Sequence, residues 1–172
     1  YVYLTSHNKM ADEINQTRLK ELPGKSYFYE AKVVGEFKET QFPNEPKIEL
    51  KVGAQVMFIR NDASGEKKYY NGKLAEITNL NEDEIWVRID DQDEDYKIKQ
   101  DVWEQKVYSL DAEKNIKEDV LGSFEQFPIR LAWAVTIHKS QGLTFDRLII
   151  DAGRSFASGQ VYVALSRCRT LE

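Results

Sequence analysis

The stretch Leu131-Ala-Trp-Ala-Val-Thr-Ile-His-Lys-Ser-Gln-Gly142 joins an apolar half to a polar half that ends on a glycine. The polar half gathers hydroxyl, imidazole, ammonium and amide groups, and each of these groups can bind a phosphate or a base. The residues concerned are Thr136, His138, Lys139, Ser140, Gln141 and Gly142. The composition predicts a helix over residues 131–141, ended by Gly142. An ordinary polar helix end, with His138 as a surface residue, fits the same composition.

The segment that follows predicts a strand and a second helix. Residues 147–151 form an apolar run typical of a buried parallel strand. Ser158 can cap a helix that runs from Gly159 to about Arg169 and presents Arg167 near its end. The planar fork of an arginine suits a transferring phosphoryl group, although arginines in a last helical turn also complement the helix dipole.

The start of the chain predicts the same strand-and-helix texture. Residues 1–5 alternate and concentrate strand formers. A helix capped by Ser6 or Asn8 follows and ends near Leu22, before Pro23-Gly24. Its expected apolar stripe is Met10, Ile14 and Leu19. Because a strand occupies the first residues, we expect the chain to be a piece of a larger protein.

Short β-like runs separated by turn signals fill the middle of the chain. They cover residues 27–37, 47–60, 73–77, 85–89, 96–98 and 102–108. Residues 111–120 are polar and charged, and we expect a linker there. Short strands at this spacing predict a small barrel, inserted into an α/β layer that both ends of the chain share. The expected domains are residues 1–26 with 121–172, interrupted by the insert at 27–120.

Composition limits the class of protein. The chain has 172 residues, 41% hydrophobic and 31% charged, which fits a folded domain with an insertion. Its longest uncharged apolar run, residues 131–137, is too short to cross a membrane. A single cysteine, Cys168, allows no internal disulfide and fits a cytoplasmic protein. No cluster of metal-ligating residues is expected.

Charge is uneven along the chain. The net charge of −5 argues against nonspecific coating of nucleic acid. Residues 130–172 are nevertheless basic, with Arg130, Lys139, Arg147, Arg154, Arg167 and Arg169 against Asp146, Asp151 and Glu172. Gly24-Lys25-Ser26 imitates the end of a phosphate-binding loop, GxxxxGK(S/T), but Leu19 stands where that loop needs glycine. The triplet is therefore expected to be an ordinary turn.

Two motifs carry a resemblance to a known family. The stretch 131–146 closely resembles motif V of superfamily 1B helicases of the RecD and Pif type, and Gly159-Gln-Val-Tyr-Val-Ala-Leu-Ser-Arg167 resembles their motif VI. Both occur in the expected order, about 13 residues apart. Residues 4–15 resemble the region of motif IV. Residues 50–58 with Asn71-Gly72 resemble the inserted SH3-like domain of these proteins.

The resemblance implies part of an ATP-dependent DNA helicase, moving 5′ to 3′. The implied fold is a partial RecA-like (P-loop NTPase-type) sheet with an inserted SH3-like barrel. Thr136, His138, Lys139 and Ser140 would line a single-stranded DNA path. Gln141 and Gly142 would couple that path to the ATP cleft, and Arg167 would be the arginine finger on the γ-phosphate. Arg169 lies just past the motif.

The resemblance also implies a partner outside this sequence. The phosphate-gripping lysine and the Mg²⁺-binding carboxylates would belong to an N-terminal RecA-like domain of the same polypeptide. ATP and Mg²⁺ are thus expected as cofactors of the complete protein. This chain alone, which lacks Walker A and B motifs, is expected to be inactive.

The barrel carries its own candidate site. Lys67 and Lys68 precede Tyr69 and Tyr70, and a mixture of basic and aromatic groups can hold unpaired bases. The acidic runs at 82–84 and 90–95 are expected to form a solvated face or a protein-docking surface. Trp86 and Trp103 are expected in the barrel core. A different class of function also stays open, in which the chain is a noncatalytic adaptor within a larger nucleic-acid enzyme.

Overall fold

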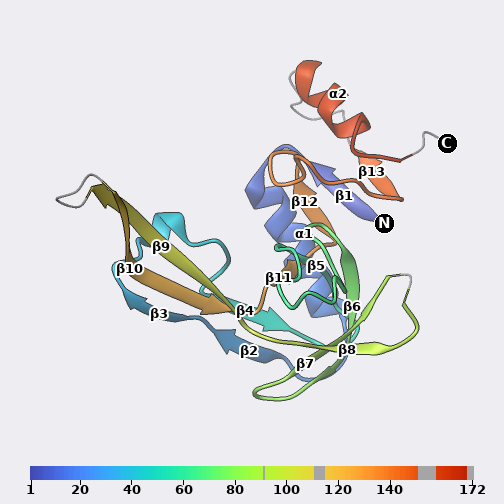
Figure 1. Cartoon of the computed structure of the whole chain (residues 1–172). Helices are drawn as coiled ribbons and strands as arrows, with labels where there is room; N and C mark the ends of the chain where they lie inside the picture. Colours follow the sequence, from blue (N-terminus) through green and yellow to red (C-terminus); the bar gives the residue numbers. More distant parts are fainter. Residues whose placement is uncertain (91, 111–114, 151–157, 170–172) are drawn as a thin grey trace.

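The two ends of the chain meet in one parallel sheet (Figure 1). The computed structural model describes residues 1–90, 92–110, 115–150 and 158–169. β1 (Val2–Thr5) is the central strand and pairs in parallel with β12 (Ala134–Thr136) and with β13 (Leu148–Ile150). Val2 and Leu4 on one face are fully buried and Thr5 on the other face is also buried, as expected for a strand covered on both faces. The predicted strands at both ends are confirmed, although Asp151 lies outside the described residues.

Helix α1 (Asn8–Glu21) follows β1 and packs against β1 and β12. Its buried side chains are Ala11, Asn15 and Leu19. The predicted stripe was therefore partly wrong, because Met10 and Ile14 are only half-buried. The predicted caps were also wrong. His7 is the N-cap residue and makes no side-chain cap bond, while the Ser6 hydroxyl lies 2.7 Å from His7 Nδ1.

A polar side chain holds α1 onto the sheet. Asn15 Nδ2 donates to the Ala134 carbonyl at 2.9 Å, and the Ala134 N–H donates to Asn15 Oδ1, also at 2.9 Å. Asn15 is only 8% exposed, so these bonds satisfy both polar ends of the amide away from water. The bonds fix the start of β12 relative to α1.

The helix predicted over residues 131–141 does not form. The segment holds the end of β11 (Ile129–Leu131), then β12, then turns. β11 pairs antiparallel with β5 (Gln55–Phe58), and β12 pairs with β1. Periodicity cannot distinguish a short apolar run in a strand from one in a helix, and here two existing strands supply the partners.

The middle of the chain is antiparallel. The largest sheet has the order β11-β5-β6-β7-β8, with β6 (Leu74–Leu80), β7 (Ile85–Ile89) and β8 (Asp95–Ile98). β2 (Tyr27–Glu30) and β4 (Lys47–Leu50) form an antiparallel pair beside it. Leu19 of α1 joins the core of this region, which includes Leu50, Val56, Phe58, Ile77, Ile85, Val87, Ile89 and Ile129. The predicted strands are confirmed, except that the runs 27–37 and 47–60 are each divided in two. The barrel assignment stays a prediction.

A third sheet projects away from the rest of the chain (Figure 1). It has the order β3-β10-β9, with β3 (Lys32–Gly35), β9 (Asp101–Leu110) and β10 (Ile116–Gln126), and the short 3₁₀ helix η1 (Glu39–Gln41) follows β3. The linker predicted at residues 111–120 was thus wrong over residues 116–120, and residues 111–114 lie outside the described residues. Pairing with β9 along the whole of β10 outweighs the polar composition.

The two tryptophans do not belong to the core. Trp103 is half-buried on the projecting sheet, where its ring meets Phe124 edge-on at 6.0 Å. Trp86 is also half-buried, with Lys97 Nζ 5.9 Å from its ring centre. The core prediction for both was wrong, because the side chain of a cation, Arg60 or Lys97, covers one face of each indole.

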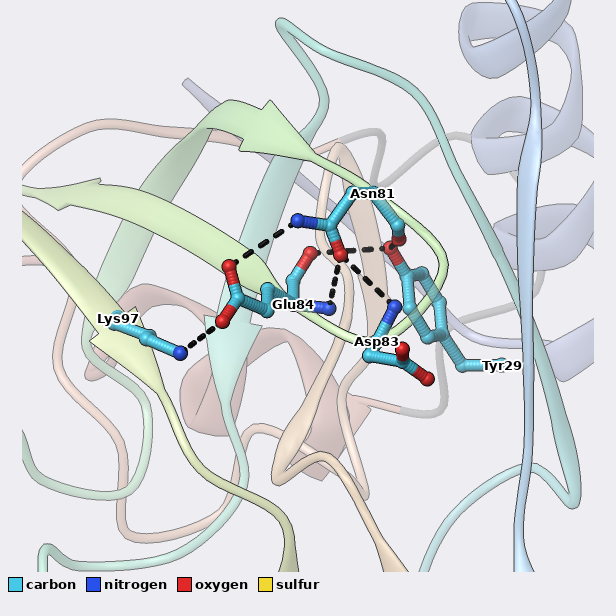
Figure 2. A network of polar contacts seen from close by, with 5 residues as sticks. All are labelled: Tyr29, Asn81, Asp83, Glu84 and Lys97. Carbon is cyan, nitrogen blue, oxygen red and sulfur yellow. Dashed lines mark hydrogen bonds and ion pairs between the residues drawn. The ribbon is translucent and has the colours of Figure 1, made fainter.

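A polar network closes the β6–β7 turn and attaches β2 to it (Figure 2). Asn81 Oδ1 accepts the N–H groups of Asp83 and Glu84 at 2.9 and 2.8 Å. The Glu84 carboxylate forms an ion pair with Lys97 of β8. From β2, the Tyr29 hydroxyl donates to the Asn81 carbonyl at 2.6 Å. Burial, with smaller contributions from Tyr27 and Asp83, raises the pKa of Tyr29 to about 12.

No helix in the described part of the chain is long and apolar enough to cross a membrane.

Replacing Asn15 with Ala is expected to lower the free energy of unfolding by about 3 kcal/mol, because the buried Ala134 N–H and C=O lose their partners. Urea unfolding of the chain measures this change. The exposed neighbour Gln16 is the matched control, and Gln16→Ala should cost less than about 0.5 kcal/mol. Equal losses in the two variants would refute the role given to Asn15.

Replacing Tyr29 with Phe tests the pH dependence of the network. The folded state favours the protonated phenol, so its contribution is complete below about pH 10 and falls as pH rises toward the folded pKa of about 12. At about pH 8 the Phe variant should be less stable by about 1 kcal/mol. This difference should shrink at about pH 11. Urea unfolding at both pH values measures it, and a constant difference would contradict the prediction.

Candidate functional site

The residues after β12 form a tight turn beside the edge of the parallel sheet. The Ile137 N–H donates to the carbonyl of Thr5 at 3.0 Å, which ties the turn to the end of β1. The Ser140 N–H donates to the Thr136 carbonyl at 3.0 Å, and the Ser140 hydroxyl donates to the Ile137 carbonyl at 2.8 Å. Thr136 Oγ1 accepts the Lys139 N–H at 3.4 Å. The hydroxyl groups of Thr136 and Ser140 therefore stabilise the turn through hydrogen bonds to its own backbone.

Exposure divides the predicted DNA-contacting residues into two kinds. Thr136 and Ser140 are buried, at 3% and 0% exposure, and use their hydroxyls within the turn. His138 and Lys139 are exposed. The turn thus displays an imidazole and an ammonium group at the carboxyl edge of the parallel sheet, where α/β proteins commonly bind ligands. Gln141 and Gly142 are also exposed and complete the turn.

Arg167 lies just past the last helix. The predicted helix to Arg169 is shorter in the structure, because α2 (Ser158–Leu165) ends in a turn. This turn is tied to Phe145, whose N–H donates to the Arg167 carbonyl at 2.8 Å and whose carbonyl accepts the Arg169 N–H at 3.1 Å. The backbone that carries Arg167 is thus anchored to the segment that follows Gly142.

The Arg167 side chain is half-buried and oriented by three hydrogen bonds. Its Nε donates to the Val163 carbonyl at 3.2 Å, and one terminal nitrogen donates to the Leu143 carbonyl at 3.4 Å. The other terminal nitrogen donates to the Ser166 hydroxyl at 3.0 Å. An arginine carries more N–H donors than these bonds use, so the guanidinium can still bind a phosphate.

The structure therefore brings two separate predictions together. Leu143 directly follows Gln141-Gly142, and its carbonyl accepts from Arg167. Arg169, in contrast, forms an exposed ion pair with Asp146 at 3.0 Å. Arg167 is therefore placed to bind a ligand next to the turn, whereas Arg169 is paired with a carboxylate at the surface. Arg154 lies outside the described residues.

A pocket of about 270 Å³ lies beside Thr136 and Lys139, between α1, β12 and the start of β4. Arg130 and Asn44 line it, and each has a buried polar atom without a partner, Nε and Oδ1 respectively. Burial lowers the pKa of Arg130, and the nearby charges of Glu45 and Asp12 oppose that shift. In the sequence Arg130 stands out only as one of the basic residues of 130–172, and Asn44 only as part of the turn signal Pro43-Asn44. Neither pattern indicates a pocket.

The candidate lysines of the insert lie on the loop between β5 and β6. Asp62 organises this loop, because its carboxylate oxygens accept the N–H groups of Ser64 at 2.8 Å and Lys68 at 2.9 Å. Desolvation opposes ionisation of Asp62, but these bonds outweigh it and lower the pKa of the carboxyl group. Lys67 has a left-handed backbone, with φ of 53°, and both lysines are exposed.

The same loop is anchored at its base. The Tyr69 ring stacks on Phe58 with ring centres 3.8 Å apart. The loop then reaches Gly72, which lies against Leu143, the residue that follows the turn after β12. Among the described residues, no group of His, Cys, Asp and Glu side chains is arranged to hold a metal ion.

Comparisons with known proteins identify relatives over nearly the whole chain. No family model matches it. The chain is 32% identical to the ATP-dependent DNA helicase Pif1 of Campylobacter jejuni over 97% of its length and 40% of that protein. It is 35% identical to the ATP-dependent DNA helicase PIF1 of Homo sapiens over 98% of its length and 26% of that protein. The chain thus spans less than half the length of these relatives.

Solved structures agree with the sequence comparison. Unliganded Pif1 from Bacteroides sp. superposes with a TM-score of 0.91 at 40% identity, covering 99% of this chain and 38% of that chain. Bacteroides Pif1 in complex with ADP-AlF3 and single-stranded DNA superposes with a TM-score of 0.77 at the same identity and coverage. The fold described above, including its RecA-like parallel sheet, is the fold of these structures.

Proposed function

The chain belongs to the Pif1-type helicases and corresponds to their C-terminal part, and we propose that it supplies one wall of an ATP-driven DNA motor. The observation that carries the proposal is the contact between Arg167 and the Leu143 carbonyl. It places a cation able to bind phosphate next to a turn that displays His138 and Lys139. The segment that follows β12 thus contacts both the nucleotide and the DNA.

Arg167 acts as an arginine finger. An N-terminal RecA-like domain of the same polypeptide would hold ATP and Mg²⁺. ATP would supply the phosphoryl group that is transferred to water, and Mg²⁺ would neutralise charge on its phosphates. Arg167 reaches the γ-phosphate from this chain and stabilises the charge that develops during transfer. Gln141 and Gly142 line the same side of the cleft. The hydrogen bonds from Arg167 to Val163 and Ser166 hold the side chain ready for this contact.

The turn after β12 contacts single-stranded DNA. Lys139 binds a backbone phosphate and His138 stacks on a base or donates to the backbone, because both side chains are exposed. Thr136 and Ser140 keep the turn in shape through their internal bonds. Alternating grip by the two domains then moves the protein 5′ to 3′ along the strand.

The insert extends the DNA path. Residues 27–120, proposed as an SH3-like barrel within a RecA-like domain of residues 1–26 and 121–172, carry Lys67 and Lys68 on an organised loop.

The chain by itself does not hydrolyse ATP, because the phosphate-binding sequence GxxxxGK(S/T) occurs nowhere in its 172 residues. ATP turnover by the isolated chain above background would disprove this.

A noncatalytic adaptor is the second candidate. Glu82, Asp83, Asp93 and Glu94 are exposed and give the insert an acidic face that suits a protein partner. DNA binding separates the two candidates. Affinity that falls steeply between about 50 and 200 mM salt supports the motor, and weak affinity insensitive to salt supports the adaptor.

In the complete helicase, Arg167→Ala is expected to lower ATP hydrolysis by about 10³-fold or more, because charge at the transferring phosphoryl group loses its stabilisation. DNA affinity should stay nearly unchanged. Steady-state ATPase assays with DNA-binding titrations measure both quantities. Arg169→Ala is the matched control, since Arg169 pairs with Asp146 at the surface, and its activity should stay within about twofold. An equal loss in both variants would exclude the finger role.

Removing both loop lysines, Lys67→Ala with Lys68→Ala, is expected to weaken single-stranded DNA binding. The slope of log affinity against log salt should fall by about 1.4, because each lost phosphate contact contributes about 0.7. Fluorescence anisotropy at several salt concentrations measures the slope. The control replaces the exposed lysines Lys25 and Lys38. If the control changes the slope as much as the loop variant, the loop is not the contact.

A further inference from the structure

The loop that carries Lys67 and Lys68 ends against the turn that orients Arg167. Gly72 is buried just before β6, and its N–H donates to the Phe58 carbonyl at 2.8 Å. A Cβ on Gly72 would lie 2.7 Å from Leu143 Cδ2 and 3.2 Å from both Cδ1 and Cγ. Only a residue without a side chain fits here at the present position of Leu143.

Leu143 lies between Gly72 and Arg167. It is 6% exposed and packs in a core cluster with Met57 of β5, Val2 and Leu4 of β1, and Phe145. Its N–H donates to the Ser140 carbonyl at 3.0 Å, and its carbonyl accepts from Arg167. Leu143 thus joins this packed cluster to the turn through its backbone N–H and to the guanidinium through its backbone carbonyl.

The other side of the contact is equally constrained. Gly72 follows a loop that Asp62 organises through two backbone N–H groups and that Tyr69 anchors on Phe58. The Asn71 N–H also donates to Asn61 Oδ1 at 2.9 Å. A displacement of Lys67 or Lys68 is thus transmitted to Gly72, because hydrogen bonds and ring stacking hold the residues between them in fixed positions.

We infer that Gly72 is a positioning residue for the motor: by leaving room for Leu143, it couples DNA contact on the insert loop to the orientation of Arg167. The inference rests on the function proposed above and adds a route between its two sites. Gly72 and Leu143 are both buried. They act through Arg167, whose placement controls the chemical step.

The physical basis is close packing. A methyl carbon at position 72 would lie 2.7 Å from Leu143 Cδ2, too close for two carbon atoms, so the packed side chain of Leu143 must shift. A misplacement of about 1 Å in a group that supports the chemistry can cost about 10²-fold in rate. Binding of ATP and DNA depends on other residues, so the affinities for both are less sensitive to a shift of Arg167.

The test is Gly72→Ala in the complete helicase. With saturating single-stranded DNA, kcat for ATP hydrolysis should fall by about tenfold or more. KM for ATP and the DNA dissociation constant should each stay within about twofold, which a general loss of structure would not produce.

Gly24→Ala is the matched control. Gly24 has φ of 94° and Gly72 has φ of 95°, so both substitutions strain a left-handed backbone equally. A Cβ on Gly24 meets nothing within 4 Å, and the residue lies outside both sites. The control should keep kcat within about twofold.

Shortening Leu143 supplies a second, independent variant. Leu143→Ala should also lower kcat. The carbonyl of residue 143 accepts from Arg167, and the substitution removes the packed side chain that fixes the position of this carbonyl. In the double variant the methyl group at position 72 enters space that Leu143 has vacated, so the double variant should turn over ATP as fast as Leu143→Ala alone. Fully additive losses would show that the two residues act separately.

Three outcomes overturn the inference. They are a kcat of Gly72→Ala equal to that of Gly24→Ala, a Leu143→Ala variant that keeps full kcat, and fully additive losses in the double variant. Each result leaves the proposed function standing if Arg167→Ala still abolishes hydrolysis. If Arg167→Ala hydrolyses ATP normally, the proposed function itself fails, and the two failures are therefore distinguished.

Discussion

The architecture depends on parallel pairing between β1 and two strands from the other end of the chain, β12 and β13. A parallel pair needs a long crossover, and here the crossover between β1 and β12 contains the whole antiparallel region. Asn15 then fixes β12 to α1 through the buried bonds to Ala134. Without this closure the turn after β12 would have no defined position relative to the end of β1.

The antiparallel region is packed onto the parallel sheet and not merely tethered to it. β11 pairs with β5 and continues almost directly into β12. Met57 shares a core cluster with Val2 and Leu4. Because cores are close-packed, such a shared cluster transmits small displacements between its parts. The positioning role inferred for Gly72 depends on this property, because Gly72 and Arg167 belong to different parts of the fold.

Within the site, burial separates framework from surface. The residue types of the turn predict binding chemistry for all its polar side chains, yet Thr136 and Ser140 use their hydroxyls internally. His138 and Lys139 face solvent. The same division applies to the arginines, since Arg167 is oriented by carbonyls and Arg169 pairs with a surface carboxylate. Residue type alone could not make these distinctions, because hydrogen-bond partners come from distant segments.

The sequence by itself determined the terminal strands, helix α1, most of the central strands, and the motif residues that carry the resemblance. These features follow from local periodicity, turn residues and motif order. Only the tertiary structure decided that residues 131–142 form strand ends and a turn in place of a helix, and that residues 116–120 extend β10. It alone revealed the contact between Gly72 and Leu143. The physical reason is that strand pairing and close packing depend on partners far away in the chain, which no local pattern records.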